Sequence, residues 1–218
     1  MLSSLVDRLN DRRRADEEVG EDAGFTLIEL MVVLLIMAIL LAIAIPTFLG
    51  VTGSANDRAA QSNLNTALTS AKGVYESNQQ VYPAVATLVS AIAKDEPSLT
   101  VQADSGSQLA AGDIGVYVTS GGNGALLYSL AKKTNECWWV ADNTQAIQNG
   151  AANSVTSPGA PWAVITLKNG AGKGSGVPNA SGEYYGVYKV SPGTTYCDVA
   201  GLTANTSTIQ SSGFPTAA

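Results

Sequence analysis

Apolar residues are distributed unevenly along the chain, and one stretch of them predicts a membrane-spanning helix. Residues 25–49 read FTLIELMVVLLIMAILLAIAIPTFL, with 18 Leu, Ile, Val, Met or Phe residues and a single charge, Glu29. As a helix, this stretch would be about 37 Å long, which exceeds the roughly 30 Å of a membrane's hydrocarbon layer. We therefore expect a transmembrane helix over residues 25–50.

The flanking charges predict the orientation of this helix. Residues 1–24 carry four Arg and seven acidic residues, too polar a composition for a core. Arg12, Arg13 and Arg14 precede the apolar stretch, whereas only Arg58 follows it at a similar distance. By the positive-inside rule, residues 1–24 form a cytoplasmic leader of a single-pass cell-membrane protein, and the residues beyond about 50 face outward.

Two other interpretations of the apolar stretch remain open. It could be a removable secretory signal cut after Ala42-Ile43-Ala44, or a plain signal anchor in which Glu29 has no role. The acidic leader, the length of the stretch and Pro46 behind the cut disfavour the first. A carboxylate in a membrane span is rarely without a function, which disfavours the second.

A second helical pattern follows over residues 51–83. Its apolar residues recur every three or four positions and form one stripe: Ala60, Leu64, Ala67, Leu68, Ala71, Val74 and Tyr75. Pro46 within the apolar helix, followed by Gly50 and Gly53, predicts a kink or a helix break at this point. Pro83 is expected to stop the helix.

The rest of the chain predicts a sheet. Residues 84–112 read as a helix-to-sheet loop with a short helix at Val85–Ala93, and from about 113 the apolar pattern alternates. The expected strands are Ile114–Thr119, Leu126–Leu130, Cys137–Ala141, Ala163–Leu167, Tyr184–Val190 and Thr195–Val199. The predicted fold is α+β: a long amino-terminal helix packed on an antiparallel sheet (residues 113–200) with one hydrophobic face, then a loose tail (201–218).

Composition excludes several functions. The chain has no His, two Cys and a net charge of −6, which disfavours His-dependent nucleophilic catalysis, most zinc sites and binding of nucleic acid by the isolated subunit. No catalytic cluster is evident in residues 84–218, so we expect no enzyme activity, no cofactor and no metal site. Asp142 and Asn143 are weak calcium candidates without the repeated spacing of oxygen ligands.

Three smaller features have structural interpretations. Trp138-Trp139 and Tyr184-Tyr185 lie in expected strands, so one of each pair should be buried and the other exposed. The segment from Asn169 to Gly176 reads as a glycine-rich turn. The neighbouring charges Asp57-Arg58 and Lys132-Lys133 are expected to be solvated or to contact another subunit.

The sequence GFTLIEL at residues 24–30, followed directly by the apolar stretch, resembles the class III signal of type IV prepilins and pseudopilins. This resemblance covers about 30 residues and implies a pilin-like fold. It also implies that a membrane prepilin peptidase cuts after Gly24 and methylates the new amino terminus at Phe25.

The resemblance further implies a structural role in a filament. Glu29, Phe25 and Thr26 would serve assembly, with Glu29 pairing mainly with the Phe25 amine of a neighbouring subunit. The helix beyond Pro46 could melt and extend on packing, or the helix could simply leave the membrane there. The implied partners are identical or related subunits, the peptidase, a platform membrane protein and an assembly ATPase, and the filament would lie on the cell surface.

Three functional interpretations stay open. A pilin serving adhesion, motility or DNA uptake is favoured by Cys137 and Cys197, because many pilins join their carboxy-terminal loop to the sheet by a disulfide. Two free thiols are the alternative for these residues. A pseudopilin of type II secretion is compatible with Tyr82-Pro83, which resembles the pair that ends the long pseudopilin helix. A membrane-anchored surface-binding domain is the third interpretation.

Overall fold

The computed structural model describes residues 25–104, 109–147, 162–163, 171–174, 177–190, 196–197 and 199–216. The leader 1–24, including Gly24, lies outside these residues. The helices are α2 (Leu27–Ser77), α3 (Val85–Asp95) and α4 (Val199–Ala204). The strands are β1 (Val101–Ala103), β2 (Ile114–Val118), β3 (Gly124–Leu130), β4 (Glu136–Asn143), β5 (Trp162–Ala163), β6 (Ala171–Gly174), β7 (Val177–Pro178), β8 (Gly182–Lys189) and β9 (Ser207–Gln210).

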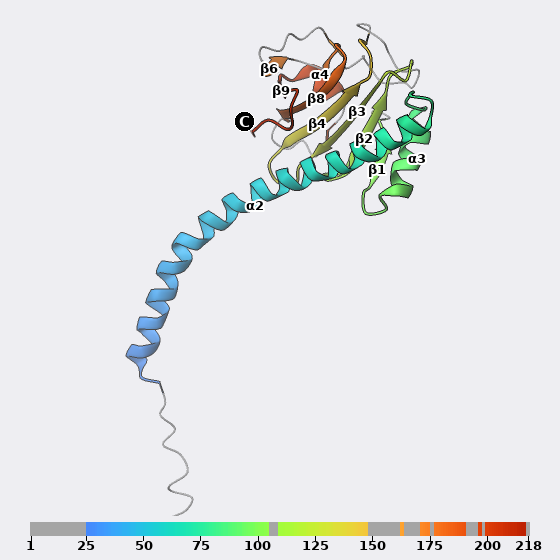
Figure 1. The fold of residues 1–218 in the computed structure, drawn as a ribbon. Helices are drawn as coiled ribbons and strands as arrows, with labels where there is room; N and C mark the ends of the chain where they lie inside the picture. Colours follow the sequence, from blue (N-terminus) through green and yellow to red (C-terminus); the bar gives the residue numbers. More distant parts are fainter. Residues whose placement is uncertain are drawn as a thin grey trace, which may run out of the picture. The chain divides into compact units, whose positions relative to one another are not determined.

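The fold is α+β, with a long apolar amino-terminal helix and a sheet, as predicted (Figure 1). The chain divides into two units at Leu49/Gly50, and α2 contributes to both. In the second unit, seven strands are ordered β1-β2-β3-β4-β8-β9-β6. The sheet is mixed, because β1 pairs with β2 in parallel while the other neighbours are antiparallel. The expectation of a wholly antiparallel sheet missed β1, a strand too short to show alternation.

The apolar stripe of α2 packs against one face of the sheet, which confirms the predicted helical periodicity. Five of its residues are buried and two more are partly buried against the same cluster: Ala60, Leu64, Ala67, Leu68 and Ala71, then Val74 and Tyr75. α2 ends at Ser77, where Gln79 and Gln80 adopt left-handed backbone angles (φ 56° and 60°). The helix therefore stops before Pro83 is reached.

The central strands are buried on both faces, so the prediction of a single hydrophobic face is wrong. Trp138 and Trp139 are both 0% exposed. Trp138 belongs to the cluster under α2, whereas Trp139 belongs to a second cluster on the opposite face. Likewise Tyr184 is buried and Tyr185 is half-buried against Phe214, instead of one being exposed. The predicted alternation of side chains between the two faces of these strands is confirmed. The layer of residues that covers the second face was not predicted.

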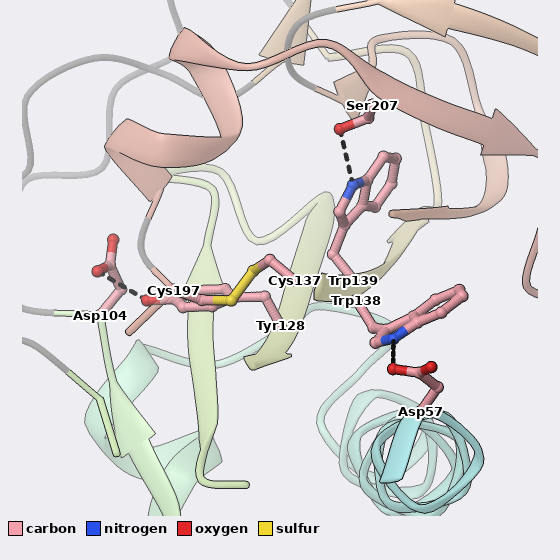
Figure 2. The surroundings of a disulfide bond; sticks show 8 residues. All are labelled: Asp57, Asp104, Tyr128, Cys137, Trp138, Trp139, Cys197 and Ser207. Carbon is pink, nitrogen blue, oxygen red and sulfur yellow. Dashed lines mark hydrogen bonds between the residues drawn. A yellow bond between two sulfur atoms is a disulfide. The ribbon is translucent and has the colours of Figure 1, made fainter. Parts of the chain in front are cut away.

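The carboxy-terminal residues provide that second layer (Figure 2). A disulfide joins Cys137 on β4 to Cys197, with the Cα atoms 5.9 Å apart. Trp139 Nε1 donates a hydrogen bond of 3.1 Å to Ser207 on β9, and Leu202 of α4 packs in the same cluster. Residues 207–210 are therefore an internal strand, and the prediction of a loose tail is wrong.

Other predictions need correction in the same region. Ala171–Gly174 forms the edge strand β6 within the segment expected to be a turn, because glycines are tolerated where backbone pairing to β9 supplies the order. Val199 begins α4, and Tyr196 and Cys197 lie in no strand, so the expected strand 195–199 is wrong. Of the expected strand 163–167, Ala163 lies in β5 and residues 164–167 lie outside the described ranges.

One ion pair ties α2 to the sheet. Lys72 Nζ lies 2.7 Å from Glu183 Oε2, and Tyr185 donates a hydrogen bond to Oε1 of the same carboxylate. Burial would raise the pKa of Glu183, but the hydrogen bonds from Lys72 and Tyr185 outweigh it and hold that pKa below its usual value. Burial first, and then the bond to Glu183, raise the pKa of Tyr185.

Gly186 should be needed for the stability of the fold, because the indole of Trp139 lies directly over it. A Cβ at Gly186 would sit 2.2 Å from the indole carbons Cε2 and Cζ2. We expect Gly186→Ala to destabilise the fold by about 1–3 kcal/mol through overpacking. The measurement is urea unfolding followed by tryptophan fluorescence. Gly73→Ala is the matched control, because nothing lies within 4 Å of its Cβ position on α2, and it should stabilise by up to about 1 kcal/mol.

Removing the disulfide should loosen the layer over Trp139. The bridge spans 60 positions of sequence, so loop entropy predicts a loss of about 4 kcal/mol in the double substitution Cys137→Ser, Cys197→Ser. The free energy of unfolding of the oxidised chain, the reduced chain and the double variant should be compared. Equal stability of all three would contradict the expected contribution of the bridge.

Candidate functional site

The candidate site is the start of α2, where the three predicted assembly residues, Phe25, Thr26 and Glu29, lie together. Glu29 Oε2 accepts hydrogen bonds from the Thr26 backbone N–H (2.9 Å) and from Thr26 Oγ1 (2.7 Å). The Glu29 N–H in turn donates to Thr26 Oγ1 (3.3 Å). This reciprocal arrangement is a capping box, which satisfies backbone donors that the start of a helix otherwise leaves unpaired.

Thr26 is expected to serve assembly, and the structure adds a capping role that was not predicted. The signal is present as Thr26-x-x-Glu29 immediately before an apolar run. Because both hydrogen bonds reach Oε2, the Oε1 atom of Glu29 keeps its acceptor capacity. Phe25 is 90% exposed and precedes Glu29 by four positions, and Gly24 lies outside the described residues.

Beyond this turn, α2 presents apolar side chains that nothing in the described chain covers. From Leu27 to Val51 the large apolar residues are between 48% and 74% exposed. The best 18-residue window of α2 has a mean hydropathy of 3.1, so the helix is long and apolar enough to cross a membrane. Covering each such side chain is worth about 1.5–3 kcal/mol, so a surface of this extent needs lipid or protein around it.

α2 runs without interruption through Pro46, Gly50 and Gly53, so the break expected there is absent from the single chain. Proline removes one helical hydrogen bond and crowds the preceding turn. Thr47 Oγ1 donates to the Ile43 carbonyl (2.9 Å), which partly compensates for the disturbed backbone pairing. Melting of this stretch on packing stays a prediction.

A second polar site, at Asp57 on α2, was not anticipated. Asp57 is 7% exposed, not solvated as expected, because its Oδ1 accepts hydrogen bonds from Thr134 Oγ1 (2.6 Å) and from Trp138 Nε1 (3.2 Å). Figure 2 shows the carboxylate of α2 directed at the indole. These bonds fix the turn between β3 and β4 against the helix. Position 57 lies three residues before Ala60 on the buried stripe, which was the available signal.

The described residues contain no group of three or more His, Cys, Asp and Glu side chains that could hold a metal ion. The calcium candidates are engaged elsewhere: Asp142 accepts a hydrogen bond from Tyr82 (2.5 Å), and the Asn143 amide donates to the carbonyls of Pro178 and Ala180. Burial, followed by this bond to Asp142, raises the pKa of Tyr82. A surface groove of about 370 Å³ beside Tyr82 has no charged lining residue.

Residues 21–45 match the family model described as the prokaryotic N-terminal methylation motif. This motif is the class III prepilin signal of type IV pilins and pseudopilins, which confirms the resemblance seen in the sequence. No curated protein and no solved structure matches the chain significantly. The match covers the capping box and most of the exposed apolar helix.

Thr26→Val should fray the first turn of α2, because it removes the hydroxyl that both accepts from and donates to Glu29. Loss of a cap costs about 1 kcal/mol, so the amides of Glu29 and Leu30, which both bond to Thr26, should exchange hydrogen about fivefold faster in micelles. Thr26→Ser retains the hydroxyl and is the matched control. Equal exchange in both variants would show that Thr26 does not cap the helix.

Proposed function

We propose that this chain is the precursor of a type IV pilin-like structural subunit, whose activity is self-assembly into a surface filament. The supporting observation is the methylation motif at residues 21–45, which overlaps an uncovered apolar helix with Glu29 in its first turn. In the membrane this helix anchors the subunit by a single pass. In the filament the same apolar surface packs against other copies and forms the core.

Processing prepares the subunit for assembly. A prepilin peptidase removes residues 1–24 by cutting after Gly24, and methylates the amine of Phe25. The cut creates the one cation that the apolar segment lacks, since Glu29 is the only charge between residues 25 and 49. An unpaired carboxylate in apolar surroundings is costly, so it favours any arrangement that brings this amine close.

The capping box is compatible with pairing between subunits. In the single chain, the Thr26 N–H and hydroxyl stabilise one carboxylate oxygen of Glu29, while Oε1 can still accept the Phe25 ammonium of a neighbouring copy. Thr26 then orients Glu29 and the neighbouring amine completes its neutralisation. The pair would fix the axial position of each incoming subunit.

The second unit forms the outer coat of the filament. The implied partners are identical or related subunits, the prepilin peptidase, a platform membrane protein and an assembly ATPase. Because the methylation motif occurs in pseudopilins as well as pilins, the same chemistry would also serve a short filament of a type II secretion system. The length of the filaments distinguishes these two functions.

Glu29→Val should leave membrane insertion intact and abolish filaments, because the variant helix is more apolar but has no partner for the Phe25 amine. Fractionation of membranes measures insertion, and electron microscopy of the cell surface detects filaments. Glu76→Val, an exposed acid on the same helix, is the control and should assemble normally.

Amino-terminal sequencing of the filaments completes this test. We expect the mature chain to begin at methylated Phe25. Normal filaments from Glu29→Val, or a finished filament that retains residues 1–24, would contradict the proposal. A chain that begins at Ile45 would instead indicate a secreted protein released by signal cleavage.

A further inference from the structure

Three lysines lie on the turn between β3 and β4 or beside it. Lys132 and Lys133 are exposed on the turn itself. Lys189 ends β8 opposite Glu136, next to the Val190 N–H that donates to the Asn135 carbonyl (3.0 Å). All three side chains are exposed. We call Lys132, Lys133 and Lys189 the basic collar.

Two of the acids near the basic collar are buried. Asp57 is 7% exposed and Glu136 is 3% exposed, so neither offers its charge to the surface. Asp113, which adjoins Gly112 beneath the Lys132 side chain, is half-buried and accepts a hydrogen bond from Gln102 (3.0 Å). The exposed charges on the turn itself are therefore those of lysines, although the whole chain is acidic.

The backbone at Lys133 is an additional indication of function. Lys133 has φ 78°, a left-handed conformation that a lysine adopts only at a steric cost and that glycine adopts freely. The turn would form more easily with glycine here. A long cation at a position whose backbone disfavours it suggests that the charge is used.

The chain itself limits how far the basic collar can lie from the end of the apolar segment. Thr134 Cγ2 lies 3.5 Å from the Cβ position of Gly53, and Gly53 follows Leu49 by only four residues. Four residues extend at most about 14 Å in any conformation. The headgroup layer adds about 5–7 Å to each side of the hydrocarbon, and charges act over about 8–10 Å at physiological salt.

We propose that the basic collar binds the anionic phosphate headgroups of the membrane in which the subunit is anchored. The inference rests on the membrane anchoring proposed above. Lipid is favoured as the occupant because every anchored copy has headgroups within reach of this turn, whatever its neighbours. The contact holds the second unit at the membrane surface and is lost when the subunit leaves the bilayer for the filament.

The positive-inside rule is compatible with this contact. That rule counts Lys and Arg close to the span in sequence, because insertion is decided before the domain folds. Only the tertiary fold brings Lys132, Lys133 and Lys189 near the end of the span. They therefore do not affect the orientation that the leader determines.

The test is hydrogen exchange of the full chain in lipid nanodiscs made of phosphatidylcholine alone or mixed with an equal amount of phosphatidylglycerol. We expect the amides of residues 131–135 to exchange about fivefold more slowly with the anionic lipid at low salt, and equally in both discs at high salt. The double variant Lys132→Gln, Lys133→Gln should lose this difference. The control Lys94→Gln, Lys173→Gln removes the same charge from exposed sites elsewhere and should retain it.

A third variant separates binding from folding. Lys133→Gly removes one collar charge while relieving the left-handed backbone, so it should fold at least as stably and show weaker protection by anionic lipid. Equal exchange in both discs by a retained wild-type chain would overturn this inference alone. Slower exchange that depends on the number of copies per disc, and not on the lipid, would mean that the basic collar contacts a second copy. That result would also overturn the inference. A chain that neither disc retains would overturn the membrane anchoring together with this inference.

Discussion

The constraint on which the molecule depends is an apolar helix surface that its own chain does not cover. Large apolar side chains from Leu27 to Val51 are about half exposed or more, on a helix that is continuous to Ser77. A globular protein would bury such a surface, and this one instead continues the same helix into a folded domain. The exposed half therefore requires lipid or protein around it, whereas the packed half is buried against the sheet.

The first turn of α2 has its backbone donors paired within the chain, but the charge of Glu29 needs a partner from another chain. A helix start needs its backbone donors paired, and Thr26 with Glu29 achieves this within the chain. The same carboxylate retains a charge that an apolar environment does not tolerate alone. Capping thus orients Glu29 without neutralising it, which leaves its charge for the proposed pairing with the Phe25 amine of another copy.

The folded domain is closed by its carboxy-terminal segment. α2 covers one face of the sheet, while Cys197, held by the disulfide, and α4 pack on the other, so Trp138 and Trp139 are both fully buried. Asp57 then links the beginning of this domain to the β3–β4 turn through Thr134 and Trp138. Through that link, the turn that carries Lys132 and Lys133 lies beside the start of the packed half of α2.

Local sequence determined the elements whose signal is periodic or composed of adjacent residues. The apolar run at 25–49, the stripe from Ala60 to Tyr75 and the motif at residues 24–30 were read correctly because each repeats or is contiguous. The short strands β1, β6 and β9 were not, because backbone pairing with distant strands stabilises them despite weak local preference. Burial of both sheet faces, the internal position of Asp57 and the gathering of the basic collar were likewise decided only by the tertiary structure, since each depends on contacts between residues far apart in the chain.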